Sequence, residues 1–266
     1  MNRLETILEA KRREVAERLA SADRAALEAA ARRHSRRPFA PVLVREGLSV
    51  IAEMKRSSPS KGLLCEHYDP VALARAYFQA GARAISVLTD QPFFGGSLEH
   101  LTLVRQTVPL PLLRKDFLID PFQVLEAAAA GADAVLLIVA AFPAEYHDTA
   151  LREMMKHVQG WGLDALVEVH NEEELDRALA AQATVVGVNN RDLTTFEVNV
   201  ETSARLAPRL KRTISVAESG LRTSADLQRL HALGYHAFLI GEQLVTADDP
   251  GAALRELLAA PEPQPA

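Results

Sequence analysis

The chain has 266 residues, 48% of them hydrophobic and 24% charged, which is ordinary for a soluble globular protein. Its formal net charge of −5 argues against nucleic acid as the main partner, because neutralising the phosphates of a duplex requires a basic face. No uninterrupted apolar stretch is long enough to span a bilayer, and the charged residues 1–20 do not resemble a secretory signal. The single cysteine, Cys65, fits a reducing compartment, so we expect a cytoplasmic protein with no membrane partner.

Residues 1–48 precede the first predicted strand and form an N-terminal helical extension. Apolar residues recur there with helical spacing among many arginines and glutamates, at Leu4, Ile7, Leu8, Val15 and Leu19. We expect helices that pack on the following domain as a cap on one end, in preference to a separate partner-binding module. The basic run Arg32–Arg37 could meet an anion, but a solvated charged surface is the favoured interpretation.

Between residues 49 and 260, short apolar runs alternate with alanine-rich amphipathic segments. Pro70 and Pro121 are placed to open helices, and Gly81 and Gly131 to end them. The apolar runs show no polar alternation, which is typical of parallel strands buried on both faces. The expected strands are Val50–Glu53, Ala84–Leu88, Leu112–Lys115, Ala134–Ile138, Asp164–Glu168, Val185–Asn189, Thr213–Ala217 and Ala237–Ile240.

Eight strand–helix units in succession predict an α/β fold, a closed (β/α)8 TIM barrel. A doubly wound open sheet is the alternative. No linker divides residues 49–260, so they are expected to form one catalytic barrel, and the proline-rich residues 261–266 a disordered tail.

Charged residues stand at the ends of several predicted strands. Glu53 and Lys55 are two apart and therefore point the same way, while Lys115 and Glu168 end two later strands. A parallel barrel gathers its carboxyl strand ends into one ring, so these groups can surround one substrate as acids and bases. An apolar pocket would lower the pKa of Lys115 and nearby carboxylates would raise it, and the sequence leaves that balance open.

Two further strand ends add polar groups to the same ring. Asn189 ends the sixth predicted strand, with Arg191 beside it, and either contacts substrate or only caps a turn. Glu218 follows the seventh strand and either orients Lys55 or Lys115 or is a buried ion-pair partner without a chemical role.

The last two strands are followed by glycine turns, at Ser219–Gly220 and Gly241–Glu242. In barrels these two loops commonly bind a phosphate through backbone amides. For Glu242 we expect the amide to bind and the carboxylate to point away. Phe93 and Phe117 follow the second and third strands, so an aryl substrate would suit the same mouth.

Neither a metal nor an organic cofactor is predicted. The eight histidines are scattered, and none has a ligand spacing to another histidine or to Cys65. No Gly-x-Gly-x-x-Gly motif follows a strand, which argues against a nicotinamide enzyme.

At five strand ends the residues resemble the indole-3-glycerol phosphate synthase family, in the family's order over nearly the whole chain. The matching motifs are Ile51–Ser60, Leu112–Phe117, Leu166–Val169, Val188–Leu193 and Ala217–Gly220. This resemblance implies a cofactor-independent carboxy-lyase of tryptophan biosynthesis. Its reaction would be ring closure, decarboxylation and dehydration of 1-(2-carboxyphenylamino)-1-deoxyribulose 5-phosphate.

The resemblance also implies a role for each site residue. Lys115 would be the general acid in ring closure, and Glu168 or Glu53 the base in dehydration, with Lys55 protonating the leaving hydroxyl or holding the carboxylate. Glu218 would belong to the lysine network. The remaining contacts would be Ser58 to the carboxylate, Asn189 and Arg191 to the sugar, and Ser219, Gly220, Gly241 and Glu242 to the phosphate. Glu242 stands where a small hydroxyl residue is common in the family.

Two other functions are weighed against this one. A phosphoribosylanthranilate isomerase would need a cysteine or aspartate acid–base pair, and Cys65 lies in the wrong place for it. A non-catalytic barrel that binds a phosphorylated metabolite would not need the intact set Lys55, Lys115 and Glu168. The sequence leaves the oligomeric state open, with a monomer favoured.

Overall fold

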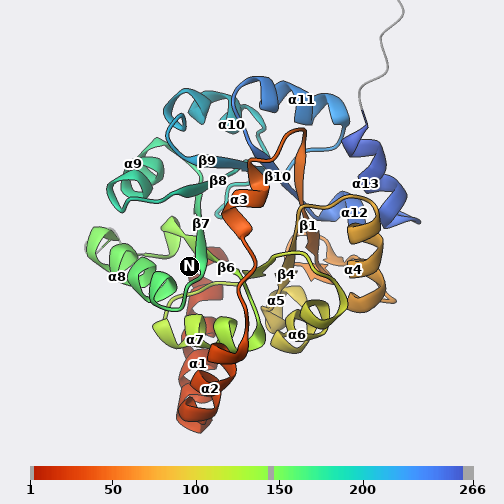
Figure 1. The fold of residues 1–266 in the computed structure, drawn as a ribbon. Coiled ribbons are helices and arrows are strands. Elements are labelled where there is room, and N and C mark those ends of the chain that lie inside the picture. Colours follow the sequence, from red (N-terminus) through yellow and green to blue (C-terminus); the bar gives the residue numbers. More distant parts are fainter. Residues whose placement is uncertain (1–2, 143–146, 260–266) are drawn as a thin grey trace, which may run out of the picture.

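The computed structural model describes residues 3–142 and 147–259, and its centre is a closed barrel of eight parallel strands (Figure 1). The first strand pairs with both the second and the last, which closes the sheet on itself. The closed-barrel prediction is therefore confirmed, and the open-sheet alternative is wrong. The strands are β1 (Ser49–Met54), β4 (Ala84–Leu88), β5 (Leu112–Lys115), β6 (Ala134–Ile138), β7 (Asp164–Val169), β8 (Val185–Asn189), β9 (Ile214–Glu218) and β10 (Ala237–Ile240).

Helices surround the barrel and cover the outer face of its strands (Figure 1). Pro70 and Pro121 do open helices, and Gly131 ends one in the left-handed conformation at φ 90°, as predicted. No helix within the described ranges is long and apolar enough to cross a membrane. The outer helices are α4 (Pro70–Gln79), α6 (Leu98–Thr107), α7 (Pro121–Ala130), α8 (His147–Gly160), α9 (Glu172–Ala180), α10 (Glu201–Leu206), α11 (Ser224–Ala232) and α13 (Pro250–Leu258).

Short elements lie in the loops that follow the carboxyl ends of the strands. The loop after β1 forms a small antiparallel hairpin of β2 (Ser57–Ser58) and β3 (Gly62–Leu63). Helix α5 (Gln91–Phe94) follows β4, and helix α12 (Glu242–Val245) follows β10. These loops supply much of the wall around the mouth of the barrel.

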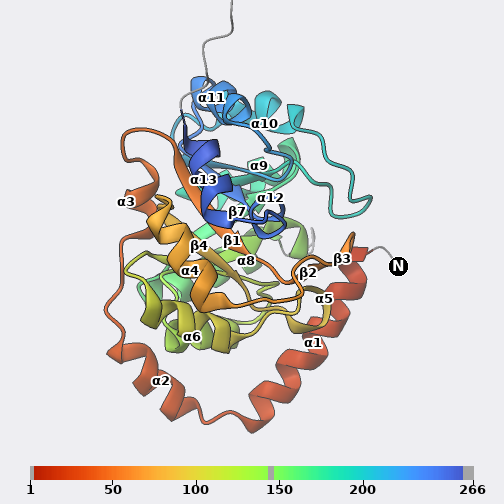
Figure 2. The ribbon, with the colours of Figure 1, turned by 90° about the vertical axis from the view of Figure 1, so that its right-hand side faces the viewer.

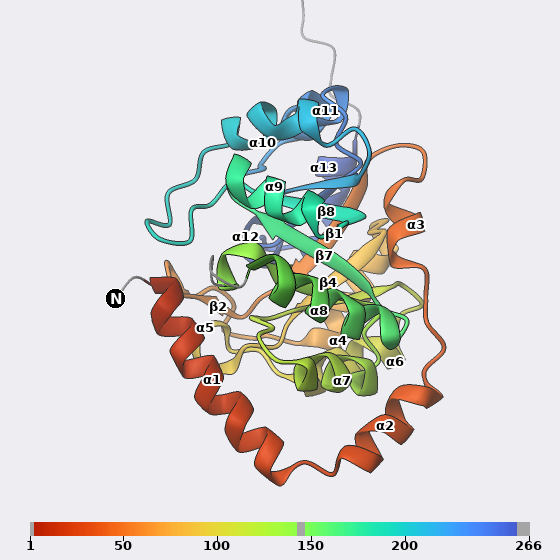
Figure 3. The ribbon, with the colours of Figure 1, turned by 90° about the vertical axis from the view of Figure 1, so that its left-hand side faces the viewer.

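The N-terminal segment runs along the outside of the barrel from one end to the other (Figures 2 and 3). Helix α1 (Arg3–Ser21) contacts the carboxyl ends of β4 and β5, and α2 (Arg24–Arg33) packs against α7. Helix α3 (Phe39–Leu43) lies at the opposite end, where the Ala40 amide donates to Asp164 Oδ2 at 2.9 Å. The N-terminal helices therefore contact both ends of the barrel, whereas a cap would be confined to one end.

The basic run Arg32–Arg37 is only partly a solvated surface: Arg32 and Arg33 at the end of α2 are exposed, as expected, but Arg36 and Arg37 are turned toward the barrel. The Arg36 guanidinium donates to the carbonyl of Ala132 at 3.0 Å, and that of Arg37 donates to Val108 and Leu110 at 2.7 Å each. These carbonyls lie in the loops that enter the strands from the bottom of the barrel. Burial is the largest influence on the pKa of both arginines and lowers it, so their charge is supported by carbonyl dipoles in place of water.

Candidate active site

A cavity of about 580 Å³ opens at the carboxyl ends of the barrel strands. Side chains of both chemical kinds expected from the sequence line it, charged and aromatic. The predicted residues found there are Glu53, Lys55, Ser58, Lys115, Phe117, Glu168, Asn189, Arg191, Glu218, Ser219, Gly220, Gly241 and Glu242. Phe93 is not among the lining residues, and the α5 aromatic that does line the cavity is its neighbour Phe94.

Five charged residues from four strand ends converge at the floor of this cavity, and we call them the lysine–glutamate cluster: Glu53, Lys55, Lys115, Glu168 and Glu218. Lys115 Nζ lies 2.7 Å from Glu218 Oε2, 3.3 Å from Glu168 Oε2 and 3.9 Å from Glu53 Oε2. Lys55 Nζ lies 2.9 Å from Glu53 Oε1. Residues far apart in the sequence are therefore within bonding distance around one ammonium group.

The three carboxylates decide the protonation state of Lys115. Burial alone would lower the pKa of this ammonium, but Glu218, Glu168 and Glu53 outweigh burial and raise the pKa above its usual range. The sequence left open whether burial or nearby carboxylates dominate the pKa of Lys115; the carboxylates dominate, and the lysine is charged. Lys115 can give up a proton readily only when a basic atom of a ligand displaces these carboxylates or when one of them takes up a proton.

The two carboxylates that contact Lys115 most closely differ from each other. Burial would raise the pKa of Glu168, but Lys115 and His170 lower it below the ordinary range, so Glu168 is ionised. Burial raises the pKa of Glu218 to about 7, with the charge of Glu168 acting in the same direction and Lys115 opposing it. Environments that separate two titrating groups in this way are typical of acid–base sites.

Glu218 owes its position to the absence of a side chain on the neighbouring strand. Asn189 and Gly187 of β8 pair with β9, and a Cβ atom at Gly187 would overlap Glu218 Oε1. We expect Gly187→Ala to push this carboxylate away from Lys115 and to lower kcat about tenfold or more. The overpacking should also lower the free energy of unfolding by about 1–3 kcal/mol. Steady-state kinetics and thermal unfolding measure both effects. Gly160→Ala is the matched control, because a Cβ there meets nothing within 4 Å.

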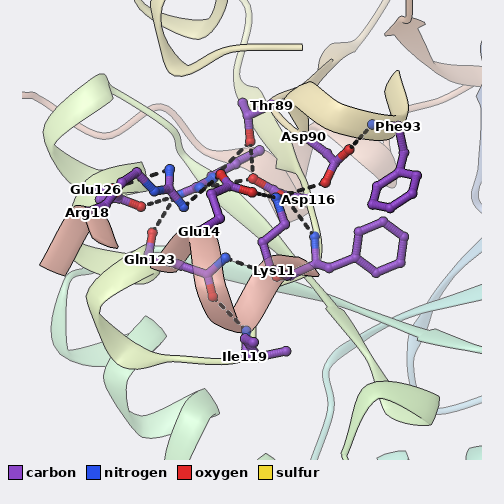
Figure 4. A network of polar contacts seen from close by, with 12 residues as sticks. Lys11, Glu14, Arg18, Thr89, Asp90, Phe93, Asp116, Ile119, Gln123 and Glu126 are labelled. Atoms are coloured by element: carbon purple, nitrogen blue, oxygen red, sulfur yellow. Dashed lines mark hydrogen bonds and ion pairs between the residues drawn. The ribbon is translucent and has the colours of Figure 1, made fainter. Parts of the chain in front are cut away.

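Helix α1 contributes a second charged network just behind the aromatic wall (Figure 4). Lys11 is fully buried, and its Nζ lies 2.8 Å from Asp90 Oδ2 and 2.9 Å from Asp116 Oδ1. Asp90 accepts a hydrogen bond from the Phe93 amide and so caps α5, while Asp116 accepts from the Phe117 amide at 2.8 Å. The N-terminal helix is thereby tied to the backbone of both aromatic loops.

Several residues at the cavity were given no individual role from the sequence. Phe94 and Lys61 line it, and Lys61 pairs with Glu242 at 2.5 Å. His170 lies behind Glu168, with Nε2 at 3.3 Å from Glu168 Oε1. A sequence signal existed for His170, because it is two residues beyond Glu168, the spacing that places Glu53 and Lys55 on one side of their strand.

The Glu242 carboxylate does not point away from the site. Besides Lys61, its Oε2 lies 3.7 Å from the Arg191 guanidinium, so the side chain faces two cations at the cavity rim. The expectation for this residue was wrong because it considered the backbone turn alone and not the lysine carried by the β2–β3 hairpin.

A closed (β/α)8 barrel with a buried lysine–glutamate cluster at its carboxyl face defines an acid–base enzyme of the TIM-barrel class. Comparison with protein families narrows this class. The family model for indole-3-glycerol phosphate synthase matches residues 4–257. The chain belongs to this family, and the predictions of a carboxy-lyase of tryptophan biosynthesis are confirmed.

Individual relatives agree over most of their length. An indole-3-glycerol phosphate synthase from Koribacter versatilis is 47% identical over 259 residues, covering 96% of this chain and 98% of its own. One from Carboxydothermus hydrogenoformans is 51% identical over 214 residues and 80% of each chain. Among solved structures, an N-acetylmannosamine-6-phosphate 2-epimerase from Clostridium perfringens has a TM-score of 0.62 at 14% identity, covering 79% of this chain and 92% of its own. That likeness shows the barrel fold alone.

Proposed function

We propose that the cavity binds 1-(2-carboxyphenylamino)-1-deoxyribulose 5-phosphate and that the lysine–glutamate cluster converts it to indole-3-glycerol phosphate. The substrate has an apolar ring and two anionic groups, and the cavity offers Phe94 and Phe117 beside fixed cations. Ser58 contacts the substrate carboxylate, and Asn189 and Arg191 contact the sugar.

The phosphate is assigned to the loops after β9 and β10. Ser219 and Gly220 both have positive φ, at 64° and 78°, which turns the chain sharply after β9. The first amides of α12 have no acceptor within their own helix, so the turn at Gly241–Glu242 can donate to a phosphate. Lys61 and Arg191 lie at the same rim, and Glu242 holds them in place through its carboxylate.

Ring closure is assigned to Lys115. The aryl carbon that bears the carboxylate attacks the ketone carbon, and the carbonyl oxygen takes a proton from the Lys115 ammonium to become a hydroxyl. The bond between the ring carbon and the carboxylate then breaks and carbon dioxide leaves. The electron pair of that bond restores the aromatic sextet. A charged lysine is the correct form for this donation, and a general acid of this kind contributes a factor of about 100 to 10,000 in rate.

Dehydration is assigned to the remaining members of the cluster. Glu168, or Glu53 in its place, removes a proton from the carbon next to nitrogen, and Lys55 protonates the departing hydroxyl, which leaves as water. The substrate enters as a carboxylate and that charge is lost with carbon dioxide, so each turnover takes up one proton from solution. The cluster must therefore exchange protons with its surroundings in every cycle.

The observation that carries this proposal is the position of Lys115 Nζ between Glu168 and Glu218 inside the cavity. The test is to mix the purified protein with the carboxyphenylamino substrate and follow indole fluorescence. We expect a rise that depends on protein concentration, and a signal no greater than that of heat-denatured protein would contradict the proposal. The isomerase alternative receives no support, since Cys65 is not among the described residues that line the cavity.

A further inference from the structure

His170 is the one imidazole that contacts the lysine–glutamate cluster among the described residues. It follows β7 directly and is nearly buried, with 9% of its side chain exposed. Its Nε2 faces Glu168 Oε1 at 3.3 Å, and its Nδ1 lies 2.9 Å from Glu174 Oε2 in α9. One imidazole therefore lies between two carboxylates, one in the cavity and one outside it.

The contacts around Glu174 fix the orientation of this imidazole. Glu174 Oε2 also accepts the His170 backbone amide at 2.9 Å, and its Oε1 accepts the side-chain amide of Asn171 at 3.1 Å. With both carboxylate oxygens occupied in this way, Nδ1 must donate its proton toward Glu174. A neutral ring would then direct the lone pair of Nε2 at the Glu168 carboxylate, which is repulsive, so the arrangement requires a proton on both nitrogens.

We propose that His170 is a positioning residue for this reaction, whose imidazolium, anchored by Glu174, keeps Glu168 ionised and holds it in place beside Lys115. The proposal rests on the role assigned above to Glu168. Asn189 Nδ2 holds the same oxygen, Oε1, at 3.1 Å, while Lys115 contacts Oε2. The carboxylate is thus held from three sides, and of these three groups His170 is the one that is itself anchored by a second carboxylate outside the cavity, that of Glu174.

The charges that face His170 support this assignment. They are Glu168 from β7, Glu174 from α9 and Asp192 from the loop after β8, with the ammonium of Lys115 behind Glu168. Burial lowers the pKa of His170, but Glu168 and Glu174 outweigh burial and raise it to about 10. The imidazolium therefore persists through neutral pH and is lost only as the pH rises through about 10.

Two substitutions separate this role from simple capping of α9. His170→Asn keeps an amide at the position of Nδ1 for Glu174 and removes the charge near Glu168. We expect kcat at neutral pH to fall roughly tenfold to a hundredfold, and the acidic limb of the kcat profile to move up by about 1 to 3 pH units, because Glu168 loses an opposite charge. Glu174→Gln leaves the imidazole in place but lowers the pKa of His170. At pH 6 its activity should be near that of the parent, and its alkaline limb should lie at a lower pH than the parent's.

The matched control is His231→Asn, since the ring of His231 contacts the backbone carbonyl of Tyr235 and His231 is not among the residues that line the cavity. It should leave kcat and both limbs unchanged. A His170→Asn protein with kcat within twofold of the parent and an unmoved acidic limb would overturn the proposal. If His170→Asn does not fold, Glu174→Gln decides, and an unchanged alkaline limb there overturns it as well. Glu168→Gln distinguishes a failure of this proposal from a failure of the proposed function. If Glu168→Gln stays fully active, the role assigned to Glu168 is wrong, independently of the results for His170.

Discussion

Lys115→Met is expected to lower kcat by at least about a thousandfold while changing KM by less than about tenfold. Methionine is also unbranched and apolar at its end, so it fills the space of the lysine stem without providing a proton. The anionic groups of the substrate are assigned to other residues, at the phosphate loops and Ser58, and binding should therefore persist. Steady-state kinetics followed by indole fluorescence measures both constants.

The control for this substitution is Lys156→Met, which removes a lysine whose side chain is 70% exposed and which pairs with Glu153 on the same helix. Its kcat and KM should equal those of the parent. If Lys115→Met instead raises KM and keeps most of kcat, Lys115 anchors the substrate and is not the acid. Thermal unfolding checks that the loss of the ammonium beside Glu168 and Glu218 has not unfolded the barrel, while Glu53 keeps its contact with Lys55.

Lys11→Met should have the largest effect on stability, about 3–5 kcal/mol at neutral pH. The substitution leaves Asp90 and Asp116 buried without their shared cation, although Arg114 still contacts Asp116 at 3.0 Å. Within the described part of the chain Lys11 is the one cation that pairs with Asp90, and burial already raises the pKa of Asp90. Chemical denaturation followed by circular dichroism measures the free energy of unfolding.

The pH dependence of this loss has a defined sign. Without Lys11 the folded-state pKa of Asp90 rises further above its unfolded value, so the penalty is largest at high pH and is relieved as the pH falls and Asp90 takes up a proton. The deficit should therefore be smaller at pH 5 than at pH 8. Arg13→Met is the control, because Arg13 is 74% exposed and pairs with Glu9 on the surface of the same helix. A Lys11→Met protein as stable as this control would show that the network in Figure 4 contributes little.

The barrel and the centre of its site could be predicted because both depend on short-range patterns. Each strand was visible as an apolar run, and parallel strands bring their carboxyl ends together whatever the loops do. Lys115, Glu168 and Glu218 could be assigned to one cavity for that reason alone. Their mutual distances and the charge state of Lys115 could not be predicted, because these depend on register and burial across three strands.

Residues beyond the strand ends were harder to predict for a physical reason. Phe93 and Phe94 are adjacent in α5, and the direction of each ring depends on the cap that Asp90 makes. Lys11 lies on the stripe of Ile7, Leu8 and Val15 that α1 buries, so its position in the helix did carry a signal. Its partners, however, come from two distant loops that no pattern within the helix identifies.

The course of the N-terminal segment has a consequence for synthesis on the ribosome. Lys11, Arg37 and Ala40 are translated first, yet the groups they bind, up to Asp164 in β7, emerge only after half of the barrel has been made. Until then Lys11 has only Glu14 of its own helix to pair with, and the Arg37 guanidinium lacks its carbonyl acceptors at Val108 and Leu110. Such long sequence separation slows folding, so this segment should dock last, and its docking should lock a barrel that is already assembled.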